Sequence, residues 1–290
     1  MINQNYLLFV LIPLSWAINS FLIKCSAGTI SLDTFNAIRF LCVVPVLFFV
    51  PRSNDSLKKL FLVALFWFGL NFYFQGKALS SNLDLGYFAL GTVTTSLFII
   101  VFSILDRLDT ITRPQIIGFS LAMTGFLVIA YENSNDLSKT MGLASLLASN
   151  ICVAIGTVLL KKFNITASFS NIAWISLMSA VFLFATSTFE NGIPAIHADI
   201  LNMSLTTLFT ILFSAFVITL WSGKLWVQVV QYFGTTTSSF SLFLVPAFSL
   251  VLAGTFLGET ISAYKCIALA FILSGVFVAT TVKANKPCND

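Results

Sequence analysis

The sequence predicts an all-α integral membrane protein in which ten transmembrane helices form two inverted five-helix repeats. Three observations support this prediction. Hydrophobic residues make up 58% of the chain and charged residues only 9%, whereas a soluble domain has about a quarter charged residues. The apolar residues form long runs, and the two halves of the chain are similar to each other. With a mean hydropathy of +0.95, the chain has more apolar surface than water can accommodate.

The apolar runs have the length that a bilayer requires, since a spanning helix needs roughly 20 apolar residues. Short polar breaks such as "PRSND" (51–55) and "ENSNDLSKT" (132–140) separate them, and "ENGIPAIHADILN" (190–202) is predicted as another connecting segment. The predicted spans are residues 5–24, 32–50, 58–81, 85–105, 114–131, 141–160, 170–189, 203–230, 234–257 and 263–282.

The basic residues predict the orientation of the chain in the membrane. If the N-terminus is placed on side one, ten Lys and Arg residues fall on that side and four on the other, with Arg39 inside a span. Short cytoplasmic loops carry the excess of Lys and Arg. We therefore expect both termini to be cytoplasmic, in a multi-pass protein of the cell membrane, such as a bacterial inner membrane. The basic residues form no nucleic-acid-binding run.

The two halves of the sequence repeat the same pattern. "SWAINSFLIK" (15–24) aligns with "CVAIGTVLLK" (152–161), "QGKAL" (75–79) with "SGKLW" (222–226), and "LDTITRPQIIG" (108–118) with "GETISAYKCIA" (258–268). This predicts two domains, residues 1–135 and 136–290, with five spans each. Because five is odd, the halves enter the membrane from opposite sides. Inverted repeats of this kind place a substrate site near the bilayer midplane.

The chain resembles the EamA group of the drug/metabolite transporter superfamily. "SWAINSFLIK" (15–24), "AIRF" (37–40) and "LVPAFSLVLAGTFLGETISAYKCIALAFILSGV" (244–276) resemble patterns of that group. The resemblance implies a secondary transporter of small metabolites, most similar to exporters of amino acids and metabolites such as O-acetylserine and cysteine. Two departures are Ser96, where a proline often stands, and Leu108-Asp109, which replace Gly-Glu.

Two Gly-Lys pairs, which are not part of the group pattern, put Lys77 and Lys224 inside apolar runs. A cation at the bilayer centre costs about 2.5 kcal/mol or more unless it meets water or a partner. We therefore expect both lysines to line the cavity and attract an anionic group. The alternative is snorkelling, in which the stem stays in the apolar layer and the ammonium reaches the interface.

Further candidates for the cavity are polar and aromatic residues within the predicted spans. Arg39 either bonds neighbouring helices or meets the substrate, and Trp16 and Asn19 share one helix face. Each of these side chains has the alternative role of helix packing. The remaining candidates for substrate contact are Asn71, Tyr73, Gln75, Trp221 and Gln228, with Trp226 beside them.

No motif for an enzyme or an ATP-driven pump occurs in the sequence, so we predict no catalytic residues, metal site or cofactor. Glu259 and Asp109, which lie near span ends, are the candidate proton carriers. Because no acid lies at mid-membrane depth, we favour facilitated exchange or efflux. Amino acids or their derivatives are the expected substrates. The alternatives are other organic anions such as nucleotide-linked metabolites, a passive channel-like permease, or a membrane scaffold. Expected partners are the lipid bilayer, a small-molecule substrate and a second copy in a homodimer.

Overall fold

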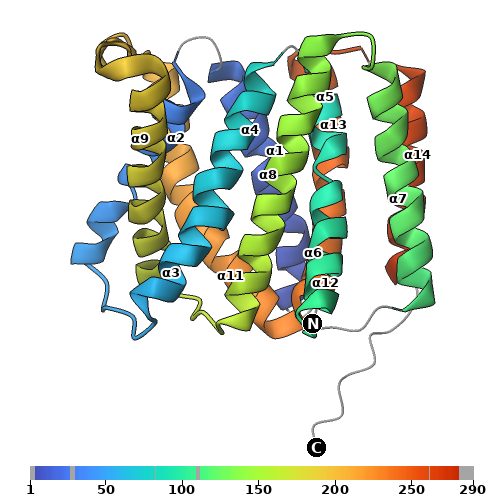
Figure 1. Cartoon of the computed structure of the whole chain (residues 1–290), viewed down its shortest axis with the longest axis horizontal. Helices are drawn as coiled ribbons and strands as arrows, with labels where there is room; N and C mark the ends of the chain where they lie inside the picture. Colours follow the sequence, from blue (N-terminus) through green and yellow to red (C-terminus); the bar gives the residue numbers. More distant parts are fainter. Residues whose placement is uncertain (1–3, 27–29, 82, 109–111, 261, 281–290) are drawn as a thin grey trace, which may run out of the picture.

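The computed structural model describes residues 4–26, 30–81, 83–108, 112–260 and 262–280, and the helices within these residues form one bundle (Figure 1). The first repeat contains α1 (Gln4–Ser26), α2 (Leu32–Leu41), η1 (Val44–Phe48), α3 (Leu57–Val63), η2 (Ala64–Leu70), α4 (Asn71–Ser80), α5 (Leu85–Gly91), α6 (Thr94–Leu105) and α7 (Arg113–Glu132). The second repeat contains α8 (Leu137–Lys162), α9 (Phe169–Leu201), α10 (Leu205–Phe213), η3 (Ser214–Ser222), α11 (Gly223–Phe233), α12 (Thr235–Ser239), η4 (Phe240–Phe243), α13 (Leu244–Phe256) and α14 (Ala263–Thr280).

The predicted fold class is confirmed. Among the described residues, eight helical segments are long and apolar enough to cross a membrane, and Ala263–Gly275 is a shorter apolar helix. The first span of each repeat starts from the opposite end of the bundle, as α1 and α8 show in Figure 1. The two halves are therefore inverted with respect to each other.

Equivalent spans of the two repeats are interrupted in equivalent places. The third and eighth spans each contain a π-helical segment N-terminal to the Gly-Lys pair: η2 ends at Leu70, ahead of Gly76, and η3 ends at Ser222, directly before Gly223. The fourth span breaks between Gly91 and Thr94, and the ninth contains the 3₁₀ segment η4. π-helical segments inside α-helices occur frequently at functional sites. These matching irregularities therefore indicate a functional site at the centre of the bundle.

Two predicted span boundaries were wrong. The span predicted over 32–50 ends as an α-helix at Leu41, and a 3₁₀ helix with Pro45 in its first turn follows. Proline lacks the N–H that a continuing helix requires. Residues 190–202, predicted as a connecting segment, are largely helical, because α9 kinks at Gly192 and continues to Leu201. Gly192 adopts a φ of 78°, which glycine tolerates without steric cost.

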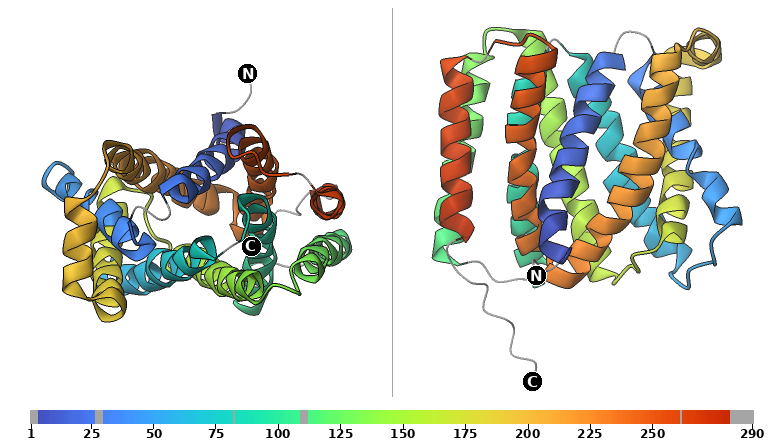
Figure 2. Two further views of the ribbon diagram at one scale, coloured as in Figure 1. Left: turned by 90° about the horizontal axis from the view of Figure 1, so that it is seen from above. Right: turned by 180° about the vertical axis from the view of Figure 1, so that it is seen from behind.

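The bundle exposes apolar side chains on its outer faces, as a protein surrounded by lipid requires. The helices α7 and α14 stand together at one end of the bundle (Figure 2), and their exposed residues include Leu127, 59% exposed, and Phe277, 71% exposed. They pack closely, since a Cβ added to Gly275 would lie 2.5 Å from the carbonyl oxygen of Gly118.

Candidate functional site: a cavity between the two repeats

A cavity of about 120 Å³ lies in the middle of the bundle, with walls from both repeats. Many of its lining residues fall in pairs when the two repeats are aligned. The pairs are Trp16 with Val153, Ser20 with Thr157, Asn71 with Ile218, Phe72 with Thr219, Thr92 with Leu242, and Thr95 with Val245. The cavity therefore lies where the inverted halves meet. In three of these aligned pairs, a polar residue of the first repeat (Asn71, Thr92 or Thr95) corresponds to an aliphatic residue of the second.

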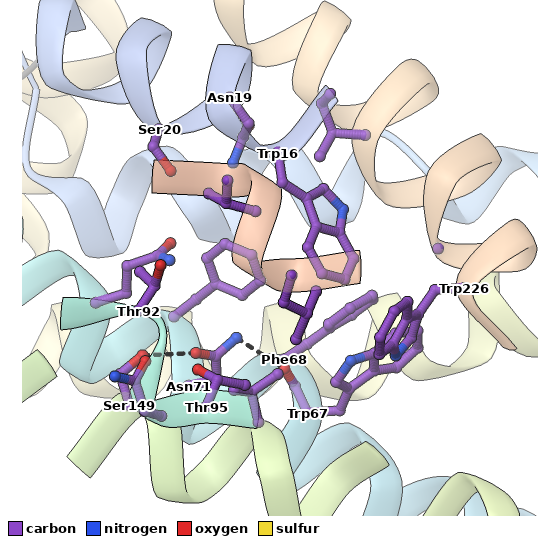
Figure 3. Close-up of a pocket in the computed structure, with 18 of the residues that line it drawn as sticks. Trp16, Asn19, Ser20, Trp67, Phe68, Asn71, Thr92, Thr95, Ser149 and Trp226 are labelled. Carbon is purple, nitrogen blue, oxygen red and sulfur yellow. Dashed lines mark hydrogen bonds between the residues drawn. The ribbon is translucent and has the colours of Figure 1, made fainter. Parts of the chain in front are cut away.

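Six of the residues that the sequence singled out lie together in the lining of this cavity: Trp16, Asn19, Arg39, Asn71, Gln75 and Trp226. Figure 3 shows Trp16 and Asn19 extending from α1 toward Asn71 and Thr92. Trp16 packs against Trp226 of the second repeat with the ring centroids 5.1 Å apart. Contact of these residues with a substrate stays a prediction.

Arg39 is the charged residue of the lining. Its side chain is 1% exposed, its Nε donates a hydrogen bond to the Thr219 hydroxyl at 2.8 Å, and its guanidinium lies 4.7 Å from the ring centroid of Phe72. No carboxylate is among the described residues that line the cavity, and Arg39 takes part in none of the ion pairs between described residues. The cavity wall therefore carries an uncompensated positive charge.

Several lining residues were missed by sequence reasoning, among them Trp67, Ser149 and Asn150. Ser149 donates to Asn71 Oδ1 at 2.6 Å, and Asn71 Nδ2 donates to the Trp67 carbonyl at 3.0 Å. Asn150 Nδ2 donates to Thr94 Oγ1 at 2.7 Å and to the Gly91 carbonyl at 3.0 Å. Two adjacent polar residues in the apolar run of the sixth span were the available signal. The Ser149 bond joins α8 to α4, and the Asn150 bonds hold α8 against the broken fourth span.

The lysines of the two Gly-Lys pairs lie outside the cavity lining. Lys77 forms an ion pair with Glu190 and lies 3.8 Å from Asp33. Tyr73, another sequence candidate, donates to Glu190 at 2.6 Å. Lys224 Nζ lies 4.4 Å from the centroid of the Phe169 ring.

Trp221 and Gln228 also lie outside the cavity lining, and both are exposed. For Tyr73, Lys77, Trp221, Lys224 and Gln228, a role in substrate binding stays a prediction that their positions in this conformation do not support.

Two other lysines occupy equivalent positions in the two repeats, and because the repeats are inverted they lie at opposite ends of the bundle (Figure 1). Lys24 donates to the carbonyls of Leu79 and Leu83, at 3.3 and 2.9 Å. Lys161, its counterpart in the repeat alignment, donates to the carbonyl of Gln231 at 2.9 Å. Each lysine thus satisfies carbonyls at or beyond the C-terminal end of the third span of its own repeat, where helical carbonyls lack partners.

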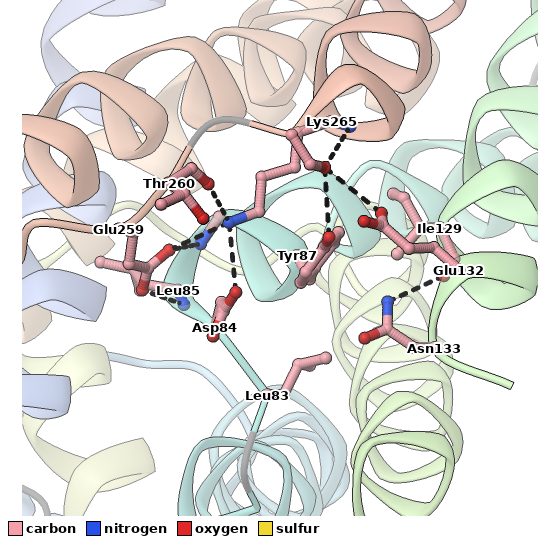
Figure 4. Close-up of polar contacts among 12 residues, drawn as sticks. Leu83, Asp84, Leu85, Tyr87, Ile129, Glu132, Asn133, Glu259, Thr260 and Lys265 are labelled. Atoms are coloured by element: carbon pink, nitrogen blue, oxygen red, sulfur yellow. Dashed lines mark hydrogen bonds and ion pairs between the residues drawn. The ribbon is translucent and has the colours of Figure 1, made fainter. Parts of the chain in front are cut away.

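Glu259, considered above as a proton carrier, holds the start of α5 (Figure 4). Its carboxylate accepts from the backbone N–H groups of Leu85 and Gly86 at 2.7 and 3.0 Å. Lys265 is 1% exposed, and its Nζ lies 3.6 Å from Glu259 and 3.2 Å from Asp84. These contacts fit a structural role, because a carboxylate stabilises a helix N-terminus. Asp109 lies outside the described residues.

Long apolar helices, two inverted halves and a cavity between them define a multi-pass membrane transporter. The chain belongs to the EamA-like transporter family, which matches residues 4–131 and 140–281. This is a family of transporters and not of enzymes.

The comparisons also show individual relatives. The chain is 25% identical over 268 residues to a probable amino-acid metabolite efflux pump of Salmonella typhimurium (strain LT2), covering 90% of each protein. It is 24% identical over 268 residues to a protein of the same description from Escherichia coli (strain K12), again covering 90% of each. A protein crystal structure resembles it with a TM-score of 0.71 and 15% identity, over 96% of this chain and 97% of the other. At this sequence identity, the similarity shows a shared fold.

Proposed function

We propose that this transporter carries amino acids or amino-acid derivatives through the central cavity by alternating access, as an exporter or exchanger. The observation that supports this most directly is the uncompensated cation of Arg39 in a cavity walled by aromatic rings. A carboxylate fits the guanidinium, and concave apolar sites with a few polar groups are typical of small-molecule binding. The two relatives described as amino-acid metabolite efflux pumps agree with this proposal.

We further propose that both termini face the cytoplasm of a bacterial cell, because Lys and Arg residues concentrate on their side of the membrane. Other organic anions, including nucleotide-linked metabolites, are the second candidate class, since Arg39 would also attract a phosphate. The walls favour the amino acids, because Arg39 is the single charged residue among the described lining residues, and a phosphorylated metabolite carries more negative charge than one guanidinium balances.

Counterflow in proteoliposomes tests this function. Vesicles are loaded with unlabelled amino acids and exposed to single labelled amino acids, with and without a pH gradient. We expect saturable accumulation without the gradient. No accumulation of any amino acid would contradict the proposal, and non-saturable uptake would indicate a passive permease.

Two tryptophan variants provide a matched pair for the same assay. Trp16→Leu changes a wall of the cavity, whereas Trp221→Leu changes a side chain that is 43% exposed on the outside of the bundle. We expect Trp16→Leu to reduce counterflow strongly and Trp221→Leu to leave it near the wild-type rate. Equal effects would argue against this cavity as the transport site.

A further inference from the structure

We propose that the cavity binds its substrate as a zwitterion, with the carboxylate on the guanidinium of Arg39 and the ammonium on the amide oxygens of Asn19 and Gln75. This inference rests on the proposed function, because it describes how the same cavity distinguishes amino acids from related molecules. It starts from polar atoms in the cavity wall that have no partner in the protein.

The unpartnered donor that carries charge is Nη1 of Arg39, which makes no hydrogen bond with the described part of the chain. The guanidinium has its Nε bound to Thr219 and its face over Phe72. A buried charge without a partner is costly, and a bound carboxylate removes that cost. The guanidinium fork also matches the two oxygens of a carboxylate. Arg39 therefore selects an anionic group in a substrate.

Among the described lining residues, the amide oxygens without a partner are Asn19 Oδ1 and Gln75 Oε1, and the Thr157 hydroxyl, which can donate or accept, also has none. The contrast with the other amides of the wall is informative, because the side chains of Asn71 and Asn150 bond to the protein. A carbonyl oxygen accepts but never donates, so these two positions suit a donor such as an ammonium.

Aromatic rings stand beside Asn19. In Figure 3, Trp16 lies between Asn19 and Trp226, and Trp67 and Phe68 lie on the facing wall. Such ring faces attract a cation. The cavity thus offers one place for a negative group and another for a positive group, and no described lining residue supplies a carboxylate that would pair with a fully cationic ligand.

The test compares phenylalanine with two analogues that each lack one charged group: 2-phenylethylamine without the carboxylate and 3-phenylpropanoate without the ammonium. Competition against labelled phenylalanine counterflow is measured with the whole protein in proteoliposomes. Binding is measured in parallel by quenching of tryptophan fluorescence, since Trp16, Trp67 and Trp226 line the cavity. Each analogue should bind about tenfold more weakly than phenylalanine or worse, because each lacks a charge-assisted hydrogen bond.

Variants assign the two ends of the substrate. Arg39→Gln should weaken the binding of phenylalanine about tenfold and leave the affinity for 2-phenylethylamine unchanged. Asn19→Leu should weaken the binding of phenylalanine and leave the affinity for 3-phenylpropanoate unchanged. Arg52→Gln, at an exposed arginine before α3, is the matched control. It should change the affinity for none of the three ligands. If Arg39→Gln does not fold, the comparison of ligands on the unsubstituted protein still decides the question.

The outcomes separate this inference from the proposed function. If phenylalanine is transported but either analogue competes as well as phenylalanine does, the zwitterion assignment is overturned and amino-acid transport stands. If the unpartnered atoms serve only to bind water, Arg39→Gln changes the affinities for phenylalanine and 2-phenylethylamine equally, which also overturns it. If no amino acid is transported or quenches the fluorescence, the proposed function fails and the inference fails with it.

Discussion

Lys77 of α4 forms an ion pair with Glu190 of α9, and this contact joins the first repeat to the second at one end of the bundle. Tyr73 of α4 donates to the same carboxylate at 2.6 Å. At the other end, Asp55 accepts a hydrogen bond from Asn171 of α9 at 2.5 Å. In alternating access one half moves against the other, so contacts at the two ends are expected to break in different states.

The first prediction concerns the Lys77–Glu190 contact. Glu190→Gln should favour opening at the end where α4 terminates, because it removes an ion pair between the repeats. An exposed pair contributes about 0.2–1 kcal/mol, which corresponds to a shift in population of up to about fivefold. The readout is the rate at which a membrane-impermeant maleimide, added on that side, labels a single cysteine placed at Ser20 in the cavity.

The matched control for this experiment is Asp106→Asn. It breaks the exposed pair of Lys162 with Asp106, whose atoms are 2.8 Å apart, at the opposite end of the bundle. It should not raise labelling from the side of Glu190. Unchanged labelling in Glu190→Gln would show that the ion pair does not hold the halves together.

The second prediction is a pH dependence of stability at Asp55, in the segment before α3. Burial acts to raise the pKa of this carboxyl, but hydrogen bonds from Thr166, Asn171 and Ser53 outweigh it and hold the pKa below its ordinary value. A lowered pKa in the folded state means that the carboxylate adds stability above its unfolded pKa, about 3.9. That contribution is lost as the pH falls through the folded pKa.

Asp55→Ala should therefore lower the Tm of the purified protein at pH 6, by an amount equivalent to about 1 kcal/mol or more. The difference from the unsubstituted protein should shrink as the pH is lowered toward 3. A difference that stays constant over this range would mean that the charge of Asp55 does not matter and that only its shape does.

The third prediction concerns the close approach of α8 to η2 at Gly156. A Cβ at this position would lie 2.6 Å from the Cα of Trp67, so the backbone of η2 would have to shift. Overpacking of this kind costs about 1–3 kcal/mol, and Gly156→Ala should lower the Tm by several degrees. Gly223→Ala is the control, because its Cβ would meet Ile172 at an ordinary 3.7 Å. Equal Tm values for the two variants would contradict the close packing.

The fourth prediction separates the two roles considered for Glu259. If the carboxylate serves to hold the N-terminus of α5, Glu259→Gln should lower the Tm, by an amount equivalent to about 1–3 kcal/mol. Counterflow by the folded fraction should persist, with its pH dependence unchanged. A lost pH response together with an unchanged Tm would instead identify Glu259 as a proton carrier.

The sequence was sufficient to predict the ten spans, the duplication and the inverted arrangement of the halves. The reason is physical, because a bilayer demands long apolar helices whatever their neighbours are, and an odd number of spans in a repeated half forces inversion. The polar and aromatic residues within these spans also included Trp16, Asn19, Arg39, Asn71, Gln75 and Trp226, which the fold brings to one cavity.

Only the tertiary structure decided which face of each helix meets the cavity. Gln75 and Lys77 lie two residues apart on α4, and two residues turn an α-helix by about 200°. Gln75 therefore lines the cavity while Lys77 reaches Glu190 on α9. In the same way, Trp226 forms part of the wall and Trp221 lies exposed on the outside. The sequence determined that these side chains lie within the membrane spans, whereas the packing of the neighbouring helices determined the direction in which each one points.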